Sequence, residues 1–185
     1  MRTVFATLAV LLLGGAGYLY LGLFNVAATE HHSAPVYWVL EQARIRSIRT
    51  HAKGIEVPAG LDDPEKLLSG TDHFAAHCAV CHGAPGVPKG DIALGLYPAP
   101  PNLAEAAGRY SPAELFWILK NGIKMTGMPS WSDHGDEDLW SIVAFLEKLP
   151  GMSEPDYAKL VMTNMMNGGG HHHHHEQEQE TPPKP

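Results

Sequence analysis

The longest apolar stretch of the chain lies at its beginning. Thr3 to Phe24 contains no charged side chain and is interrupted only by glycines, which membrane helices tolerate. At 1.5 Å per residue, about 22 helical residues cross a hydrocarbon core of about 30 Å. We therefore expect residues 1–24 to form a transmembrane anchor. The alternative is a cleaved signal peptide, for which Val26-Ala27-Ala28 offers a cleavage site of small residues.

The next segment, residues 25–60, has the pattern of a linker that contains one helix beginning at Pro35. Its aromatic residues Tyr37 and Trp38, together with several arginines, suit a helix that lies on a membrane surface. The same residue types suit a connector helix that packs against the following domain. The pattern leaves both interpretations open.

Apolar positions at helical spacing predict an all-α domain over residues 61–153. Asp62 or Asp63 can cap its first helix, and Ser111 begins a second with proline and glutamate in its first turn. A third begins near Asp136, in a group of acids that suits the positive end of a helix.

Two regions of this domain are rich in glycine and proline and are expected to be loops. The first comprises residues 83–90 and then 97–103, and the second comprises residues 124–131. A loop as long as the first is unusual in a compact domain unless a bound group fills it. After the domain, residues 154–185 are expected to form a short helix and then a disordered tail of low complexity.

Composition narrows the choice of partners. The 185 residues are 44% hydrophobic and carry a formal net charge of −7, which predicts a real core and disfavours nucleic acid as a partner. Between residues 61 and 151 there are 12 acidic and 6 basic side chains. Protein partners with a basic docking patch are expected instead.

The chemistry of the chain centres on Cys78, Cys81 and His82. Two cysteines three positions apart, followed directly by histidine, form the attachment motif of haem c. One helical turn brings both sulfurs to the same side, where they can form thioethers, and His82 becomes the proximal iron ligand. A thioredoxin-like pair would need a βαβ context and a zinc site would need further ligand pairs. The sequence has neither, because these are its only cysteines.

The distal iron position has four candidates in the sequence, Met125, Met128, His134 and Met152. We expect Met128, because a thioether followed by proline in a glycine-containing loop can approach the iron. Histidine and methionine together favour reduced iron and exclude other ligands, which suits electron transfer. Without Met128 on the iron, the domain would instead be a peroxidase-like haem enzyme or a gas sensor with an open site.

Three motifs together, the cysteine–histidine motif, Pro101-Asn102-Leu103 and Met128-Pro129, resemble those of class I c-type cytochromes of bacteria. That group includes the cytochrome domains of cbb3-type oxidases. The chain is most similar to small membrane-anchored monohaem cytochromes c of proteobacteria that carry the loop found here at Gly122–Pro129. The resemblance covers residues 61–152 and implies a class I cytochrome c fold, three to five helices wrapped round one covalent haem.

The resemblance also implies roles for individual residues. The Pro101 carbonyl would accept the proton on Nδ1 of His82 and so orient the ring. Leu103, Tyr97 and Trp131 would line the haem pocket. The haem domain would lie in the periplasm, held to the bacterial inner membrane by the N-terminal helix.

The expected function is that of a membrane-tethered one-electron carrier in a respiratory chain, not an enzyme. Its partners would be a donor complex or dehydrogenase and a terminal oxidase or reductase. A separate hypothesis is that the C-terminal tail binds a metal ion, because consecutive imidazoles bind copper, nickel and zinc. These secondary metal ligands would be His171, His172, His173, His174 and His175, which have no counterpart in the class I pattern.

Overall fold

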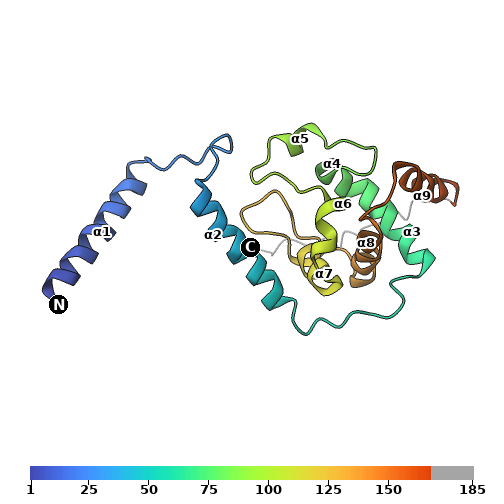
Figure 1. Ribbon diagram of the computed structural model, residues 1–185, viewed down its shortest axis with the longest axis horizontal. Coiled ribbons are helices and arrows are strands. Elements are labelled where there is room, and N and C mark those ends of the chain that lie inside the picture. Colours follow the sequence, from blue (N-terminus) through green and yellow to red (C-terminus); the bar gives the residue numbers. More distant parts are fainter. Residues whose placement is uncertain (168–185) are drawn as a thin grey trace, which may run out of the picture.

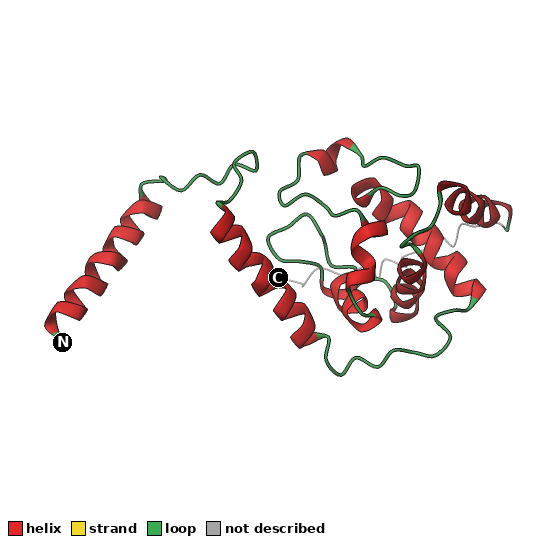
Figure 2. Cartoon of the chain, in the orientation of Figure 1, coloured by secondary structure: helices red, strands yellow, loops and turns green. Residues whose placement is uncertain are grey.

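The computed structural model describes residues 1–167, and the regular structure in that range is helical (Figures 1 and 2). An isolated β-bridge joins Ala84 and Val87. In chain order the helices are α1 (Arg2–Tyr20), α2 (Ala34–His51), α3 (Pro64–His73), the π-helical turn η1 (Phe74–Cys78), α4 (Ala79–His82), α5 (Asp91–Leu94), α6 (Leu103–Ala106), the 3-10 turn η2 (Ala107–Arg109), α7 (Pro112–Asn121), α8 (Asp136–Lys148) and α9 (Glu154–Met166). The expected all-α fold with an N-terminal apolar helix is confirmed.

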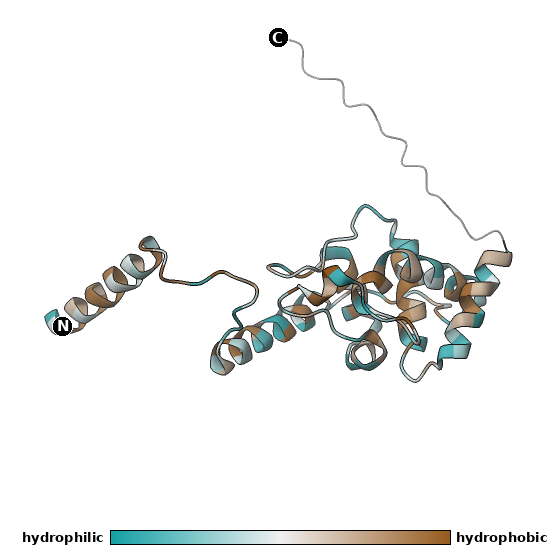
Figure 3. Cartoon of the chain, turned by 90° about the horizontal axis from the view of Figure 1, so that it is seen from above, coloured by the Kyte–Doolittle hydropathy of each residue, from teal (hydrophilic) through white to brown (hydrophobic). Residues whose placement is uncertain are grey.

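Helix α1 stands apart from the other helices and buries none of its residues (Figures 1 and 3). It has 19 residues and a mean hydropathy of 1.7 over its most apolar window. Its length is about 28 Å at 1.5 Å per residue, close to the thickness of a hydrocarbon core. The helix ends at Tyr20, four residues before the end of the predicted apolar run. By length and composition it can cross a membrane, a property that signal sequences share.

Helix α2 divides into an exposed first half and a packed second half. Residues 34–40 are exposed, whereas Ile48 is only 1% exposed. Arg44 donates a hydrogen bond of 2.8 Å to the hydroxyl of Tyr110 and forms an ion pair of 2.7 Å with Glu41. The second half of the linker helix therefore packs against the helical domain, next to α7.

The core of the domain forms where α3 packs across α8. A Cβ atom added to Gly70 would lie 1.9 Å from the carbonyl oxygen of Ser141, so only glycine permits this approach of the two backbones. Phe74 and Phe145 pack on each other at this interface, both 0% exposed. Helix α9 also packs against α3, where Asn164 donates a hydrogen bond of 2.8 Å to the Leu68 carbonyl.

Two helix starts that the sequence predicted are confirmed. The Asp63 side chain accepts a hydrogen bond of 2.9 Å from the amide of Glu65 at the start of α3. Ser111 and Glu114 form a reciprocal capping box at the start of α7. The short helix α5 lies between the two parts of the first expected loop, and Leu103 at the end of that loop already begins α6.

The predicted disordered tail and the histidines at 171–175 lie outside the described residues. The short helix expected after the domain is present as α9.

Candidate haem site

The attachment residues lie at the end of one continuous helical segment. Helix α3 passes into the π-helical turn η1, which ends at Cys78, and α4 then carries Cys81 and His82. Cys78 is buried, Cys81 is half-buried, and neither forms a disulfide. Turns of π-helix are frequent at functional sites, and the sequence pattern did not predict this one.

His82 is buried and its ring is held from one side. Its Nδ1 atom lies 2.8 Å from the carbonyl oxygen of Pro101, so a neutral imidazole donates its N–H to that oxygen. Burial lowers the pKa of His82 and nearby Lys89 lowers it further, while the bond to Pro101 opposes both effects. The ring is therefore neutral near pH 7, with its Nε2 lone pair available to a metal.

The surroundings of Cys78 argue against a redox-active dithiol. Burial, reinforced by Cys81, raises the pKa of the Cys78 thiol to about 12. Catalytic cysteines have lowered pKa values, because the thiolate is the reactive species. The pair is better suited to permanent attachment of a group than to thiol exchange.

A tight turn holds Met128. The amide of Met128 donates to the Thr126 hydroxyl at 3.1 Å, and that hydroxyl donates to the Ile123 carbonyl at 2.7 Å. The Ile123 amide in turn donates to the Met128 carbonyl at 3.1 Å. Met128 is half-buried and packs against the core, whereas Met125 is 91% exposed. Of these two methionines, the structure directs Met128 toward the domain.

The segment after Met128 is tied to the end of α7. Gly122, which ends that helix, has φ 64° and ψ −170°, a conformation that is essentially restricted to glycine. A Cβ atom at Gly122 would lie 2.6 Å from both the carbonyl carbon and oxygen of Pro129. The amide of Trp131 donates to the Leu119 carbonyl at 3.0 Å. These contacts fix the course of the Met128–Pro129 segment.

The remaining expected pocket residues have different surroundings. Leu103 and Trp131 are partly buried against the core. Tyr97 contacts the linker instead, where its ring stacks on His31 at 4.7 Å and its hydroxyl accepts a hydrogen bond of 2.9 Å from the His32 amide. The sequence did not indicate that the linker and the long loop meet here.

One of the candidate distal ligands, His134, has histidine neighbours that lie far from it in the sequence. His134 lies beside His73 and His77, with ring centroids 5.8 Å from each. The spacing of four residues between His73 and His77 on a predicted helix was the feature of the sequence that could have drawn attention to them.

The donor set fits a c-type haem. Two cysteines on one turn, a neutral histidine with one ring nitrogen already bonded, and a half-buried thioether are the groups that such a haem requires. In addition, the Trp131 indole N–H is buried and has no hydrogen-bond partner within residues 1–167. An acceptor on a bound group would satisfy it.

Comparisons with known proteins agree with this assignment. Residues 65–146 match the family described as cytochrome c oxidase, cbb3-type, subunit III. A stretch of 86 residues, 46% of this chain, is 30% identical to the quinohemoprotein alcohol dehydrogenase of Comamonas testosteroni. The matched stretch spans only 11% of that dehydrogenase. Both matches fall on the helical domain, and both are consistent with a class I c-type cytochrome.

Proposed function

We propose that the chain is a monohaem c-type cytochrome that carries single electrons. Cys78 and Cys81 would hold the haem through thioethers, and His82 and Met128 would occupy the two axial positions of the iron. When bound, the haem supplies a one-electron couple, which ligation by histidine and methionine shifts toward the reduced state. The domain would transfer electrons and would have no substrate chemistry of its own.

The observation that carries this proposal is the contrast between the two methionines of the loop. Met128 is half-buried, is held by the Thr126 turn and packs on the core, whereas Met125 is 91% exposed. A thioether directed into the domain supports a closed distal position. The same contrast disfavours the alternative functions of a peroxidase-like enzyme or a gas sensor, which need an open one.

The protein residues around the ligands have orienting roles in this proposal. The Pro101 carbonyl holds His82 in one tautomer and one ring orientation, at an Nδ1–O distance of 2.8 Å. The Thr126 hydroxyl and the Ile123 backbone keep Met128 from turning out to solvent. Fixed ligands keep the structural change between the two oxidation states small, which favours fast electron transfer.

We further propose that α1 anchors the domain to the outer face of the bacterial inner membrane, so that the haem domain is periplasmic. The apolar composition of α1 and its lack of packing against the domain support an anchor. The intact mass of the membrane-bound protein distinguishes this from a signal peptide. A mass that corresponds to a polypeptide including residues 1–24 supports the anchor. A mass that corresponds to a polypeptide beginning near Thr29 indicates cleavage.

Redox proteins are the proposed partners. The matching family is named for an oxidase subunit, and the relative is named as a dehydrogenase. These names support a place in a respiratory chain. The electron donor would be a donor complex or dehydrogenase, and the electron acceptor would be a terminal oxidase or reductase. The excess of acidic residues in the domain supports docking to basic surfaces.

The ligation is tested by the ferric absorption spectrum of the full-length holo-protein. We expect the weak band of a methionine–iron bond at the red edge of the spectrum in the parent and in Met125→Ala. The band should be absent from Met128→Ala. A parent protein without the band, or loss of the band in Met125→Ala instead, contradicts the assignment.

A further inference from the structure

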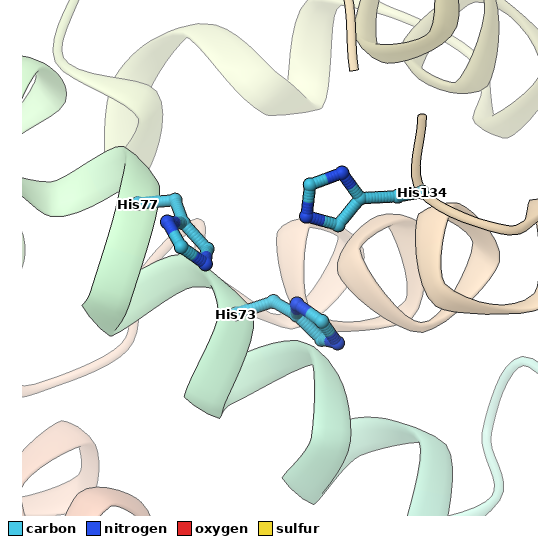
Figure 4. A group of neighbouring side chains, drawn as sticks. All are labelled: His73, His77 and His134. Carbon is cyan, nitrogen blue, oxygen red and sulfur yellow. The ribbon is translucent and has the colours of Figure 1, made fainter. Parts of the chain in front are cut away.

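Three histidines gather on the domain next to the cysteine–histidine motif. His73 ends α3, His77 lies in η1, and His134 precedes α8. Figure 4 shows their rings turned toward one another. One ring nitrogen from each lies within 4.8 Å of those of the other two. The ring centroids of His73 and His77 are 6.3 Å apart.

The environment of His73 favours a neutral imidazole. The His73 side chain is only 11% exposed, and burial lowers its pKa. His134 and His77 lower that pKa further, while Asp138 and Asp72 oppose them. Trp131 covers one side, with its ring centroid 5.5 Å from that of His77 and 5.3 Å from that of His134.

Neutral imidazoles that converge are the donors that divalent zinc, copper and nickel prefer. A carboxylate lies beside them, since Oδ1 of Asp138 is 3.8 Å from Nε2 of His73. Carboxylates next to ligating histidines orient the ring and strengthen metal binding.

We propose that His73, His77 and His134 bind one divalent transition-metal ion, with Zn²⁺ as the reference ion. Three imidazoles with a fourth position left to water form a recognised tetrahedral arrangement. At a zinc–nitrogen distance of about 2.0–2.1 Å, neighbouring nitrogens lie about 3.4 Å apart. The nitrogens, now within 4.8 Å, must therefore approach by about 1.4 Å at most. Exposed His77 and loop-borne His134 can move that far by rotating their side chains.

Such a site would join two parts of the domain that hold the haem ligands. His77 directly precedes Cys78, and His134 follows Met128 by six residues. A metal bridge between them would tie the segment that leaves the Met128 loop to the helix that carries the cysteines. Metal bound only to the folded state would stabilise this arrangement by mass action.

The test uses Zn²⁺, which has no redox chemistry and leaves the oxidation state of the haem unchanged. Because the tail also contains histidines, the parent for the experiment is the full-length holo-protein with serine at residues 171–175. Competition with a chromogenic chelator measures the affinity. We expect one Zn²⁺ per chain and a thermal midpoint that rises when Zn²⁺ is added.

His77→Gln in this parent is expected to weaken Zn²⁺ binding at least tenfold, and His134→Gln provides a second, independent variant. His51→Gln is the matched control, because His51 is an exposed helical histidine outside the cluster, and it should leave the affinity unchanged. An unchanged haem spectrum shows that each variant is folded. Parent-like affinity in both cluster variants, or no bound Zn²⁺ in the parent, overturns the proposal.

Discussion

Replacing Gly122 with alanine tests how the chain holds Met128. The backbone at Gly122, with φ 64° and ψ −170°, costs a residue with a side chain about 1–3 kcal/mol. The added Cβ would lie 2.6 Å from the carbonyl of Pro129, which is 0.8 Å inside an ordinary contact of 3.4 Å. The atoms that this Cβ would meet all belong to the backbone of Pro129 and Ser130, so no flexible side chain can move aside. Overpacking of this kind adds about 1–3 kcal/mol.

We therefore expect Gly122→Ala to lower the free energy of unfolding by about 3 kcal/mol. The clash also pushes Pro129 away from α7, and Met128 moves with it. Urea denaturation of the full-length holo-protein, followed by circular dichroism, measures the first effect. The red-edge band of the ferric spectrum measures the second, and it should weaken or disappear.

Gly108→Ala is the matched control. A Cβ atom at Gly108 would meet Pro150 at 3.5 Å, an ordinary contact, so its stability should stay within about 0.5 kcal/mol of the parent. If Gly122→Ala unfolds at the same urea concentration as Gly108→Ala and keeps the band, the account of how this turn positions Met128 is wrong.

Three further predictions concern the core, a helix start and the surface. Gly70→Ala should lower the free energy of unfolding measured in urea by about 2 kcal/mol, because the added Cβ would clash with the Ser141 backbone. This clash outweighs the gain of up to about 1 kcal/mol in helix propensity. A variant more stable than the parent would contradict this prediction. Ser111→Ala should lower stability by about 1 kcal/mol in the same assay through loss of the capping box, and no change would mean that the cap is dispensable. The rate of electron transfer with a basic redox partner should fall as ionic strength rises, and a stopped-flow rate that stays flat or rises refutes electrostatic steering.

Local features of this fold follow directly from the sequence. Asp63 and Ser111 cap helices where short-range rules place them, because a cap involves only residues two or three positions apart. The cysteine–histidine motif is equally local, since one turn of helix contains all its members. The apolar run predicted the existence of α1, but its end at Tyr20 falls four residues earlier than expected.

Features that depend on distant contacts could not be predicted in the same way. The need for glycine at position 70 arises only because α8 crosses there, 71 positions further along the chain at Ser141. The contact of Tyr97 with His31 likewise joins segments with no pattern in common. Periodicity describes one element at a time and does not show which elements meet.

The cluster of His73, His77 and His134 also depends on contacts between distant segments, so it could not be predicted from the sequence. From the sequence alone His134 is only a candidate iron ligand, because nothing local connects it to His73 and His77. The π-helical turn at Phe74–Cys78 further changes the register of those two histidines relative to a regular α-helix. Tertiary packing therefore brings together ligands that the sequence keeps about 60 positions apart.

In the proposed function His82 and Met128 close the haem on both faces, and the binding of carbon monoxide is the sharpest test of that closure. The full-length holo-protein is reduced, and its absorption spectrum is recorded before and after carbon monoxide is added. We expect no change for the parent and a clear shift for Met128→Ala, in which the distal position is opened. A shift of equal size in the parent would show that the distal position is open, and the protein would then be a ligand-binding haem protein instead of an electron carrier.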